Sequence, residues 1–538
     1  MAVLNLDKAP LLEAMRDTGN RIASCERLRI GFVVDTHLVA EWISDCIEWF
    51  KTFESFDVRV YALGAWSEPT QVNGRGVFDW VYGYSRRTFD PFQPVEITAD
   101  LILADSAENV DFNVDIVVWL ATIPPRCGDR NLAAYGALSI QLGIEDHAPP
   151  FWDETAKQQP LTCTTIWWHS GNFWRARPVR TASVTTDQGF RFTLNAQQPL
   201  SAVVHMIAAI CLEIRAQGAQ WAAKMELIPE QDYDRAAKCI KRPSEVESTS
   251  FIVKKAARSL KLRTSKRKQK SRWFVALRRA DEWSYSHGRK FIPQGFSPVQ
   301  KPIGSAMADP FLVEREDRTY LFFEEVPAGH SKGRIAYSEV FEDCTLSKPT
   351  VVLERDYHLS YPCTFCHEGD FYIIPESRAA KRIDLYRASK FPDEFKIEMS
   401  FLDDFAGADT TPVFLEGIWY FFTTAMDPFM QTFLFWSHKL TGKWNLHPKS
   451  PICSSLKSSR SAGAIKLVDG RLLRPTQDCS TRYGYAIVMN EIDTLSPTEF
   501  HEHTVDIILP TWTSSLEATH TFNRSGVFEV VDGLRFDP

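Results

Sequence analysis

The second half of the chain contains a repeat of about fifty residues, which limits the possible folds more than any other feature. Each unit places a turn-breaking Pro or Gly before an apolar run, and an acidic or glycine turn then leads into a second apolar run. The turn-breaking residues are Pro310, Pro362, Pro412 and Gly463, which lie 52, 50 and 51 positions apart. Paired strands at this period are typical of a β-propeller, in which each repeat forms one four-stranded blade.

The length of the repeat region predicts five blades. The chain from about Ser297 to Pro538 has room for roughly five units, and a hairpin around residues 527–532 belongs to the fifth. A propeller gathers the first strand of every blade around one central channel. We therefore expect the residues beside each turn-breaking Pro or Gly to be neighbours in space and to form the site.

Composition indicates a globular protein with more than one domain. The chain has 538 residues, of which 44% are hydrophobic and 24% charged, and this length predicts two or three domains. No apolar run approaches the roughly 18 residues that a membrane span needs, so we expect a cytoplasmic protein without stable membrane insertion. The 11 cysteines have no framework spacing. Reduced, buried thiols are the favoured interpretation, and no metal site is predicted.

A strongly basic stretch separates the two halves of the chain. Ten Lys or Arg and no acidic residue occur between Lys254 and Arg272, although the formal net charge of the chain is −7. Clustered cations can bind nucleic acid or anionic lipid headgroups. No aromatic residue interleaves this run, however, so we interpret it as a basic tether between two acidic domains and expect no nucleic-acid partner. The sequence leaves the oligomeric state open.

The first half alternates strand-like and helix-like segments. A continuous apolar run at Leu28–Val34 predicts a buried strand, and residues 40–50 follow with apolar side chains at helical spacing. Further continuous runs predict strands of a parallel sheet at residues 58–63, 101–104, 116–121 and 137–142. Helices between such strands imply an α/β layered domain whose site lies at the carboxyl ends of the strands.

These patterns predict a multidomain fold class, a Rossmann-like α/β domain followed by an all-β five-bladed propeller. The predicted segments are an N-terminal extension at residues 1–27, the α/β domain at 28–197, a helical and basic linker at 198–272, and the propeller at 273–538.

Three segments of the α/β domain resemble the formyltransferase superfamily that uses formyl-tetrahydrofolate. They begin with Asp-Ile-Val-Val-Trp at residue 115, Tyr-Gly-Ala-Leu-Ser at residue 135 and Pro-Leu-Thr-Cys-Thr at residue 160. Where that family has Asn and His, this chain has Ser139 and Gln141, and no Asp lies near Trp174. Because a Gln side chain does not take a proton near neutral pH, the proton transfer of the family cannot operate unchanged.

Substitute acid–base groups follow the last predicted strand of the parallel sheet. We predict a catalytic set of Gln141, Asp146, His147 and Glu154, in which His147 accepts a proton and Gln141 stabilises an oxyanion. Each of these residue types is more often a solvated loop residue. The resemblance implies formyl-tetrahydrofolate as the donor, with acyl-CoA as the alternative.

The repeat region resembles two groups of propellers. The stretch Ala308–Phe311 leading to Tyr320–Glu325 looks like the first blade of family 43 glycoside hydrolases. The longer pattern resembles the propeller module of plant glucosamine inositolphosphorylceramide transferases and of bacterial formyltransferase-like proteins. The segments that carry this second resemblance include His358–Pro362, Ile374–Ser377, Arg460–Gly463, Leu473–Asp478 and Tyr483–Gly484.

The family 43 resemblance implies acids at the start of the first three blades. Asp309 fits the first, but Tyr361 and Thr411 stand at the other two, with Asp409 and Glu376 as nearby substitutes. We therefore predict a sugar-binding funnel, although the same charges could instead pair with each other and close the blades. The predicted binding residues are Asp309, Glu325, His358, Tyr361, Glu376, Asp409, Arg460, Arg474, Gln477 and Asp478.

The favoured function is formyl or acyl transfer to an amino sugar or glycan precursor in surface polysaccharide biosynthesis, with a sugar or nucleotide-sugar substrate. Two alternatives stay open. One is glycoside hydrolysis or glycosyl transfer in the propeller, and the other is a noncatalytic carbohydrate-binding scaffold.

Overall fold

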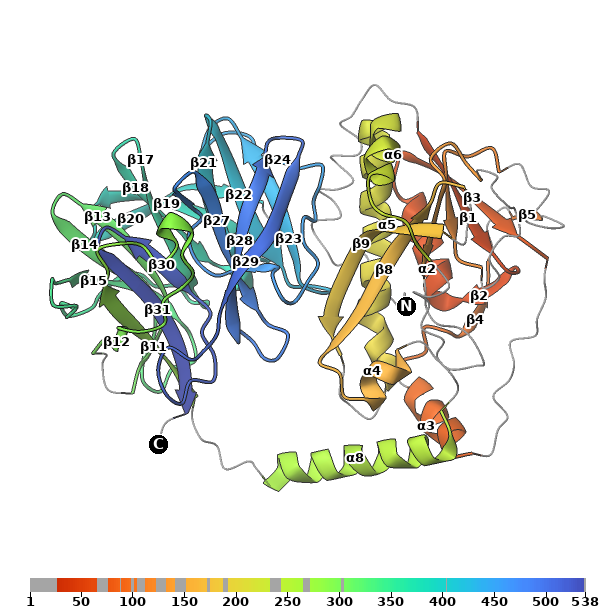
Figure 1. The fold of residues 1–538 in the computed structure, drawn as a ribbon, viewed down its shortest axis with the longest axis horizontal. Helices are drawn as coiled ribbons and strands as arrows, with labels where there is room; N and C mark the ends of the chain where they lie inside the picture. The colour runs from red at the N-terminus through yellow and green to blue at the C-terminus, as the bar shows by residue number, and fades with distance from the viewer. Residues whose placement is uncertain are drawn as a thin grey trace. The chain divides into compact units, whose positions relative to one another are not determined.

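The chain forms two compact units, Met1–Arg267 and Lys268–Pro538, in a computed structural model (Figure 1). The first unit is an α/β unit and the second is the propeller. The structure describes residues 27–64, 76–87, 89–97, 101–103, 112–121, 132–140, 151–171, 175–186, 192–232, 243–264, 271–300, 304–402 and 404–536.

An eight-stranded mixed sheet forms the centre of the α/β unit. Its strand order is β10-β9-β8-β7-β6-β1-β3-β5, in which β5, β3, β1, β6 and β7 run parallel and β8 to β10 are antiparallel additions. The strands are β1 (Leu28–Val34), β3 (Phe56–Ala62), β5 (Leu101–Leu103), β6 (Ile116–Trp119), β7 (Ala137–Ile140), β8 (Leu161–His169), β9 (Arg175–Thr185) and β10 (Gln231–Asp232), and a separate pair joins β2 (Leu38–Ala40) to β4 (Pro94–Glu96).

The predicted parallel strands are present in this sheet. The continuous apolar runs of β1, β6 and β7 are buried along nearly their whole length, whereas β5 at the edge of the sheet is largely exposed. The formyltransferase-like arrangement is not established by it: what the structure shows is a mixed sheet with helices. The helices of the unit are α2 (Glu41–Lys51), α3 (Val77–Arg86), α4 (Trp152–Ala156), α5 (Gln197–Gln217), α6 (Ala219–Glu226) and α8 (Glu245–Thr264), with a short 3-10 helix η2 (Phe192–Ala196) before α5.

Helix α5 lies in the core of the α/β unit rather than in a linker. The segment Thr193–Gln217 is long and apolar enough to cross a membrane, but 83% of its most apolar window is buried within the protein. It packs against β8 and β9. The sequence placed these residues in the linker because they follow the last strand signal, whereas burial on nearly all sides makes α5 a core helix. Part of the basic stretch is also helical, since α8 extends to Thr264.

The second unit is a five-bladed β-propeller, as the repeat predicts. Blade 1 contains β13 (Ala306–Arg315), β14 (Arg318–Val326), β15 (Arg334–Val340) and β16 (Thr350–Leu353). Blade 2 contains β17 (Ser360–His367), β18 (Asp370–Glu376), β19 (Ile383–Lys390) and β20 (Glu394–Phe401). Blade 3 contains β21 (Gly407–Leu415), β22 (Ile418–Ala425), β23 (Gln431–Ser437) and β24 (Asn445–Leu446). Blade 4 contains β25 (Arg460–Ser461), β26 (Lys466–Val468), β27 (Arg471–Asp478), β28 (Ala486–Leu495) and β29 (Phe500–Ile508).

Blade 5 is assembled from both ends of the propeller sequence, and this closes the ring. Its strand order is β12-β11-β31-β30, from β11 (Ser271–Arg279), β12 (Ser297–Pro298), β30 (Phe522–Ser525) and β31 (Phe528–Phe536). Strand β11, drawn in green, lies beside the blue β31 over nine antiparallel residue pairs (Figure 1). A buried Arg278–Glu529 ion pair, 251 positions apart in sequence, joins the same two strands.

A recurring backbone feature marks the start of the blades. The pairing register shifts in β13, β17 and β21 at Asp309, Tyr361 and Asp409, which have φ of 51°, 43° and 48°. Gly463 follows β25 with φ of 142°. Such bulges bend a strand and redirect a side chain at some cost in backbone strain. The structural equivalent in blade 3 is therefore Asp409 and not Thr411, which the turn-breaking Pro412 had suggested.

Candidate functional site

Four carboxylates of the first three blades gather where the first strands begin, and we call them the carboxylate cluster. Its members are Asp309, Glu324, Glu376 and Asp409. Asp309 and Asp409 are the bulge residues of β13 and β21. Glu324 and Glu376 come from the second strands, where each pairs with the first-strand residue before the bulge region. The four carboxyl groups therefore occupy two positions of the repeat: Asp309 and Asp409 are equivalent, and so are Glu324 and Glu376.

Arg460 of blade 4 binds two members of the cluster. Its Nε and Nη2 atoms donate to the two carboxylate oxygens of Asp409, and Nη2 also donates to Glu376 Oε2 at 2.9 Å. Gln477 Nε2 donates to Asp409 Oδ2 at 3.1 Å and to the carbonyl oxygen of Ser461 at 2.9 Å. One guanidinium therefore binds two carboxyl groups of the cluster.

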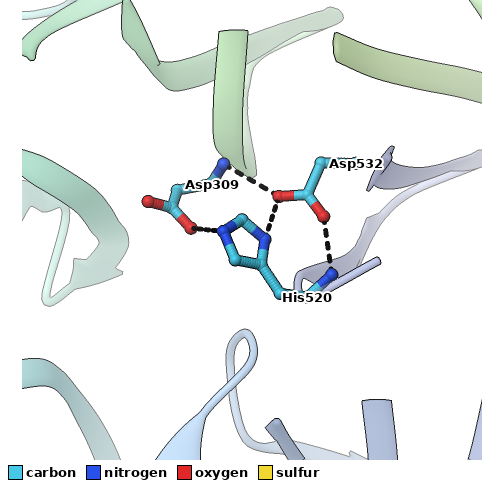
Figure 2. A group of neighbouring side chains, drawn as sticks. All are labelled: Asp309, His520 and Asp532. Atoms are coloured by element: carbon cyan, nitrogen blue, oxygen red, sulfur yellow. Dashed lines mark hydrogen bonds and ion pairs between the residues drawn. The ribbon is translucent and has the colours of Figure 1, made fainter. Parts of the chain in front are cut away.

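His520 lies between two carboxylates of blades 1 and 5 (Figure 2). Its Nδ1 atom is 2.6 Å from Asp532 Oδ2, and its Nε2 atom is 3.6 Å from Asp309 Oδ1. Asp532 also accepts the backbone N–H of Asp309 at 3.1 Å and that of His520 at 2.9 Å. Asp309 in turn accepts the backbone N–H of Tyr361 at 3.1 Å. This network joins the last blade to the first two.

Tyr361 lies next to the cluster and is fully buried. Its hydroxyl oxygen accepts the backbone N–H of Gly463 at 2.9 Å and lies 3.2 Å from the Gly463 carbonyl oxygen. The same hydroxyl is 2.9 Å from Thr411 Oγ1. The Tyr361 side chain therefore connects blades 2, 3 and 4 across the channel instead of presenting its hydroxyl to solvent.

Two partly exposed side chains, Tyr483 and His358, lie beside the cluster. Tyr483 is 47% exposed, and the Arg460 guanidinium lies 4.9 Å from the centre of its ring. The His358 side chain is 40% exposed, and its Nε2 atom is 3.3 Å from Glu324 Oε1. On the inner side, Trp273 stacks on His520 with ring centres 3.8 Å apart. An exposed aromatic ring beside acidic groups is the arrangement that contacts the apolar face and the hydroxyls of a sugar.

Burial raises the pKa of three carboxyl groups in the cluster. It raises the pKa of Asp409 to about 7, against the opposing effect of Arg460 and with help from the like charge of Glu376. Burial also raises the pKa of Asp309, although His520 lowers it. The pKa of Glu324 lies well above its ordinary value because of burial and of the neighbouring Asp309 and Glu376. The cluster therefore holds protons near neutral pH and can both donate and accept hydrogen bonds.

The two histidines of the site shift in opposite directions. Burial lowers the pKa of His520, but Asp532 and Asp309 outweigh it, so that the net pKa is raised. Burial likewise lowers the pKa of His358, and there the attraction of Asp309 is too weak to reverse it. The two carboxylates therefore favour the imidazolium form of His520, whereas burial favours the neutral imidazole form of the partly exposed His358.

One part of the site has ligand atoms that a metal ion could use. Side-chain atoms of Asp309, His520 and Asp532 lie within 4.8 Å of one another. The sequence predicts no metal site, and that expectation remains a prediction. His520 Nδ1 lies 2.6 Å from Asp532 Oδ2, and the raised pKa of His520 favours the imidazolium form, which would compete with a metal ion for that nitrogen.

The comparisons with known proteins concern mainly this propeller. Residues 298–526 match the family model described as glucosamine inositolphosphorylceramide transferase 1, N-terminal. Proteins named glucosamine inositolphosphorylceramide transferase 1 are 32% identical over 209 residues in Oryza sativa subsp. japonica and 33% identical over 204 residues in Arabidopsis thaliana. These matches cover 37% and 36% of this chain, and 28% and 26% of the two relatives. The chain thus spans little more than a quarter of the length of these relatives.

Among solved structures, a family 117 glycoside hydrolase of Zobellia galactanivorans aligns with a TM-score of 0.32 and 10% identity, over 50% of this chain and 91% of that one. An α-L-arabinanase of Cellvibrio cellulosa, complexed with arabinohexaose, aligns with a TM-score of 0.28 and 11% identity, over 37% of this chain and 77% of that one.

Most of the predicted binding residues meet at this site. The structure brings together Asp309, His358, Tyr361, Glu376, Asp409, Arg460 and Gln477. Three others lie elsewhere. Glu325 pairs with Arg334 at 2.9 Å, Arg474 is buried against Glu502 of β29, and Asp478 accepts the backbone N–H of Ser480 in a turn.

The predicted catalytic set in the α/β unit is only partly described. Gln141, Asp146 and His147 lie outside the described residues. Glu154 is buried in α4. His169 of β8 is also buried, and its Nε2 atom is 2.7 Å from Ser139 Oγ. A catalytic role for this set remains a prediction.

Several site residues were missed in the sequence. Glu324 could have been considered together with its neighbour Glu325, because successive residues of a strand face opposite sides and only one of the two can face the channel. Tyr483 was noticed only as part of a resemblance. His520 and Asp532 gave no signal, because blade 5 lacks the Pro or Gly that marks the other blades.

Proposed function

We propose that the chain is a sugar-directed transferase and that its propeller binds the saccharide at the carboxylate cluster. One observation carries this proposal: buried carboxyl groups from the first three blades, together with one arginine, lie beside the partly exposed ring of Tyr483. The match of residues 298–526 supports it, because the matched family is named for a transferase of glucosamine. Transfer of a glycosyl group to a sugar-containing acceptor is the reaction we favour.

The chemistry of the site suits a saccharide. Ionised carboxylates accept hydrogen bonds from sugar hydroxyls, and such charge-assisted bonds contribute about 1.5–3 kcal/mol each. Glu324 and Asp309 interact closely, and the pKa of both is raised by burial. Such a pair holds a proton in common, so that it can take up the proton that an acceptor hydroxyl loses. We assign this role to the pair, with Tyr483 as the stacking platform.

Formyl or acyl transfer in the α/β unit has less support. Three of its four predicted residues lie outside the described part of the chain, and Glu154 is buried. The donors formyl-tetrahydrofolate and acyl-CoA, a nucleotide-sugar substrate, a role in polysaccharide biosynthesis and the cytoplasmic location all remain predictions.

Glycoside hydrolysis is the second candidate for the propeller. The observation in its favour is the pKa of Asp409, which burial raises to about 7, a value that suits a general acid. Against it stands Tyr361 in the blade-2 position, where the hydrolase pattern requires an acid. In addition, the Asp409 carboxylate is enclosed by Arg460 and Gln477.

Two neighbouring glutamates provide a matched test of the site. Glu324 faces the cluster, whereas Glu325 lies on the opposite face of β14 and pairs with Arg334. We expect Glu324→Gln to weaken binding of glucosamine-containing oligosaccharides about tenfold, because it removes one charge-assisted hydrogen bond. Glu325→Gln should bind as the unchanged protein does, in calorimetry or saturation-transfer NMR. Equal affinity of both variants would exclude the cluster as the saccharide site.

The reaction class needs a separate measurement. Incubation with nucleotide-linked sugars and glycan acceptors, followed by mass spectrometry, should show a product heavier by one sugar residue. A product shortened by one sugar would instead support hydrolysis. A product heavier by a formyl or acyl group would support the predicted formyl or acyl transfer in the α/β unit. Binding without any product would leave the propeller a carbohydrate-binding scaffold.

A further inference from the structure

A second hollow lies between blades 4 and 5, apart from the carboxylate cluster. Its enclosed part offers only about 10 Å³ to the centre of a water-sized sphere, room for about one water molecule, and the rest of the hollow is open to solvent. Its polar wall comes from Lys466 of β26, Asn523 and Arg524 of β30, and Trp283, which precedes the turn at Tyr285. Lys466 follows the Gly463 turn, whereas Arg460 of the cluster precedes it, and Arg460 is not among the residues that line the hollow.

Two hydrogen-bond donors in this wall have no acceptor. The indole Nε1 of Trp283 is buried without a hydrogen-bond partner. Among the described residues, Lys466 Nζ forms no hydrogen bond or ion pair. Burial lowers the pKa of Lys466, and the nearest acidic groups, Cys363 and Glu314, oppose this only in part. A buried donor without a partner costs about 1–3 kcal/mol, and a buried unpaired charge costs more.

The other polar groups of the wall are already engaged. Asn523 accepts the backbone N–H of Ala464 at 2.7 Å and donates to the Pro310 carbonyl oxygen at 2.7 Å. Arg524 Nε donates to the Gly526 carbonyl oxygen at 3.0 Å. No carboxylate is among the described residues that line the hollow. The wall is therefore positively charged, and its two spare groups are both donors.

We propose that this hollow binds a small oxyanion, a carboxylate or a single phosphoryl group, which accepts hydrogen bonds from Lys466 Nζ and Trp283 Nε1. An oxyanion supplies both missing acceptors and balances the lysine charge, which neither water nor a neutral hydroxyl does. The enclosed part of the hollow holds one oxygen atom of such a group, and the rest of the ligand lies in the part open to solvent. None of the four residues of the carboxylate cluster lines the hollow, so this site goes beyond the proposed saccharide site.

The Trp283 indole provides a direct readout. In the full chain labelled with ¹⁵N-tryptophan, which contains 16 such residues, the cross-peak lost in Trp283→Phe identifies this side chain. We expect titration with inorganic phosphate, or separately with glucuronate, at constant ionic strength to move that cross-peak in a saturable way. A response to phosphate alone indicates a phosphoryl ligand, a response to glucuronate alone indicates a carboxylate, and a response to both indicates recognition of the shared oxyanion.

Variants of the lysine complete the test. Lys466→Met should weaken the anion response at least tenfold, because it removes the charged donor, whereas Lys466→Arg should retain most of it. Lys443→Met is the matched control, since Lys443 is an exposed lysine of the same propeller. The proposal is overturned if neither anion moves the Trp283 cross-peak in the unchanged protein, or if Lys466→Met responds as the unchanged protein does. The absence of any response in the unchanged protein would overturn the proposal even if Lys466→Met does not fold.

Discussion

Replacing Asp532 with Asn should destabilise the propeller and change how its stability depends on pH. Asp532 Oδ1 accepts the backbone N–H groups of His520 and Thr521, both at 2.9 Å. Asp532 Oδ2 accepts the backbone N–H of Asp309 at 3.1 Å and lies 2.6 Å from His520 Nδ1. An Asn side chain keeps one acceptor oxygen, and its NH₂ group then faces two donors.

The expected loss follows from these four contacts. Removing one partner of a buried, hydrogen-bonded charge pair costs about 3–5 kcal/mol, and Asp532 and His520 are both nearly inaccessible to solvent. The retained carboxamide oxygen still serves one pair of N–H groups, so we expect the free energy of unfolding to fall by about 3 kcal/mol. That is a large part of the roughly 5–15 kcal/mol that stabilises a typical domain, yet it leaves the variant folded.

The pH dependence distinguishes an imidazolium from a neutral ring. Asp532 and Asp309 hold the pKa of His520 above its ordinary value of 6.5, against the effect of burial. A raised pKa stabilises the folded state fully below the unfolded pKa, and the stabilisation is lost as the pH rises through the folded pKa. The difference between the unchanged protein and Asp532→Asn should therefore be largest below about pH 6.5 and should shrink above it.

Urea unfolding of the full chain tests this, with pulsed hydrogen exchange of peptides from β30 and β31 as a readout specific to the propeller. Asp404→Asn is the control, because Asp404 also has a positive φ, of 60°, but lies in an exposed pair with Lys381 at 3.4 Å. Its effect should stay within about 0.5 kcal/mol. A loss for Asp532→Asn that is the same at about pH 6 and about pH 9 would refute the imidazolium.

Two further substitutions separate structural from ligand-binding roles. Tyr361→Phe leaves the buried N–H of Gly463 without its acceptor, so it should lower the free energy of unfolding by about 1–3 kcal/mol in the same urea assay. Arg474→Met leaves the carboxylate of Glu502 unpaired, so it should destabilise the propeller by about 3–5 kcal/mol while saccharide affinity, measured by calorimetry, stays unchanged.

Each of these substitutions has its own comparison. Tyr372→Phe removes a tyrosine hydroxyl of the same blade as Tyr361 for which the described residues provide no hydrogen bond, and it should change stability by less than about 0.5 kcal/mol. Arg387→Met breaks a half-exposed pair with Asp370 and should cost less than about 1 kcal/mol. If Arg474→Met weakened saccharide binding as Glu324→Gln is expected to, the predicted ligand role of Arg474 would be restored.

The repeat predicted the fold of the propeller because the turn-breaking residues of blades 1, 2 and 4 each have a physical cause. Pro310 and Pro362 follow bulge residues, and Gly463 adopts a φ of 142° that other residues rarely adopt. In blade 3, Pro412 suggested Thr411 as the equivalent residue, but the bulge residue is Asp409, two positions earlier. Blade 5 has no turn-breaking residue of this kind. The sequence therefore did not show that its residues join the site, which they do because the ring closes.

Side-chain direction was the second limit of the sequence. Arg474 and Gln477 lie on one strand three positions apart, so they face opposite sides, and only Gln477 reaches the cluster. Nothing in a sequence shows which of two faces lines the channel until the pairing register is known. The α/β unit shows the same limit for helices, since the composition of α5 did not reveal that it packs on β8 and β9.

The way blade 5 is built has a consequence for synthesis on the ribosome. Strand β11 emerges before the four complete blades, but its partner β31 is translated only after them. Until then β11 offers unpaired backbone groups along its length, which is the kind of edge that recruits other chains. The propeller should therefore be most prone to aggregate while nascent, and an mRNA that stalls before β31 should yield an insoluble product.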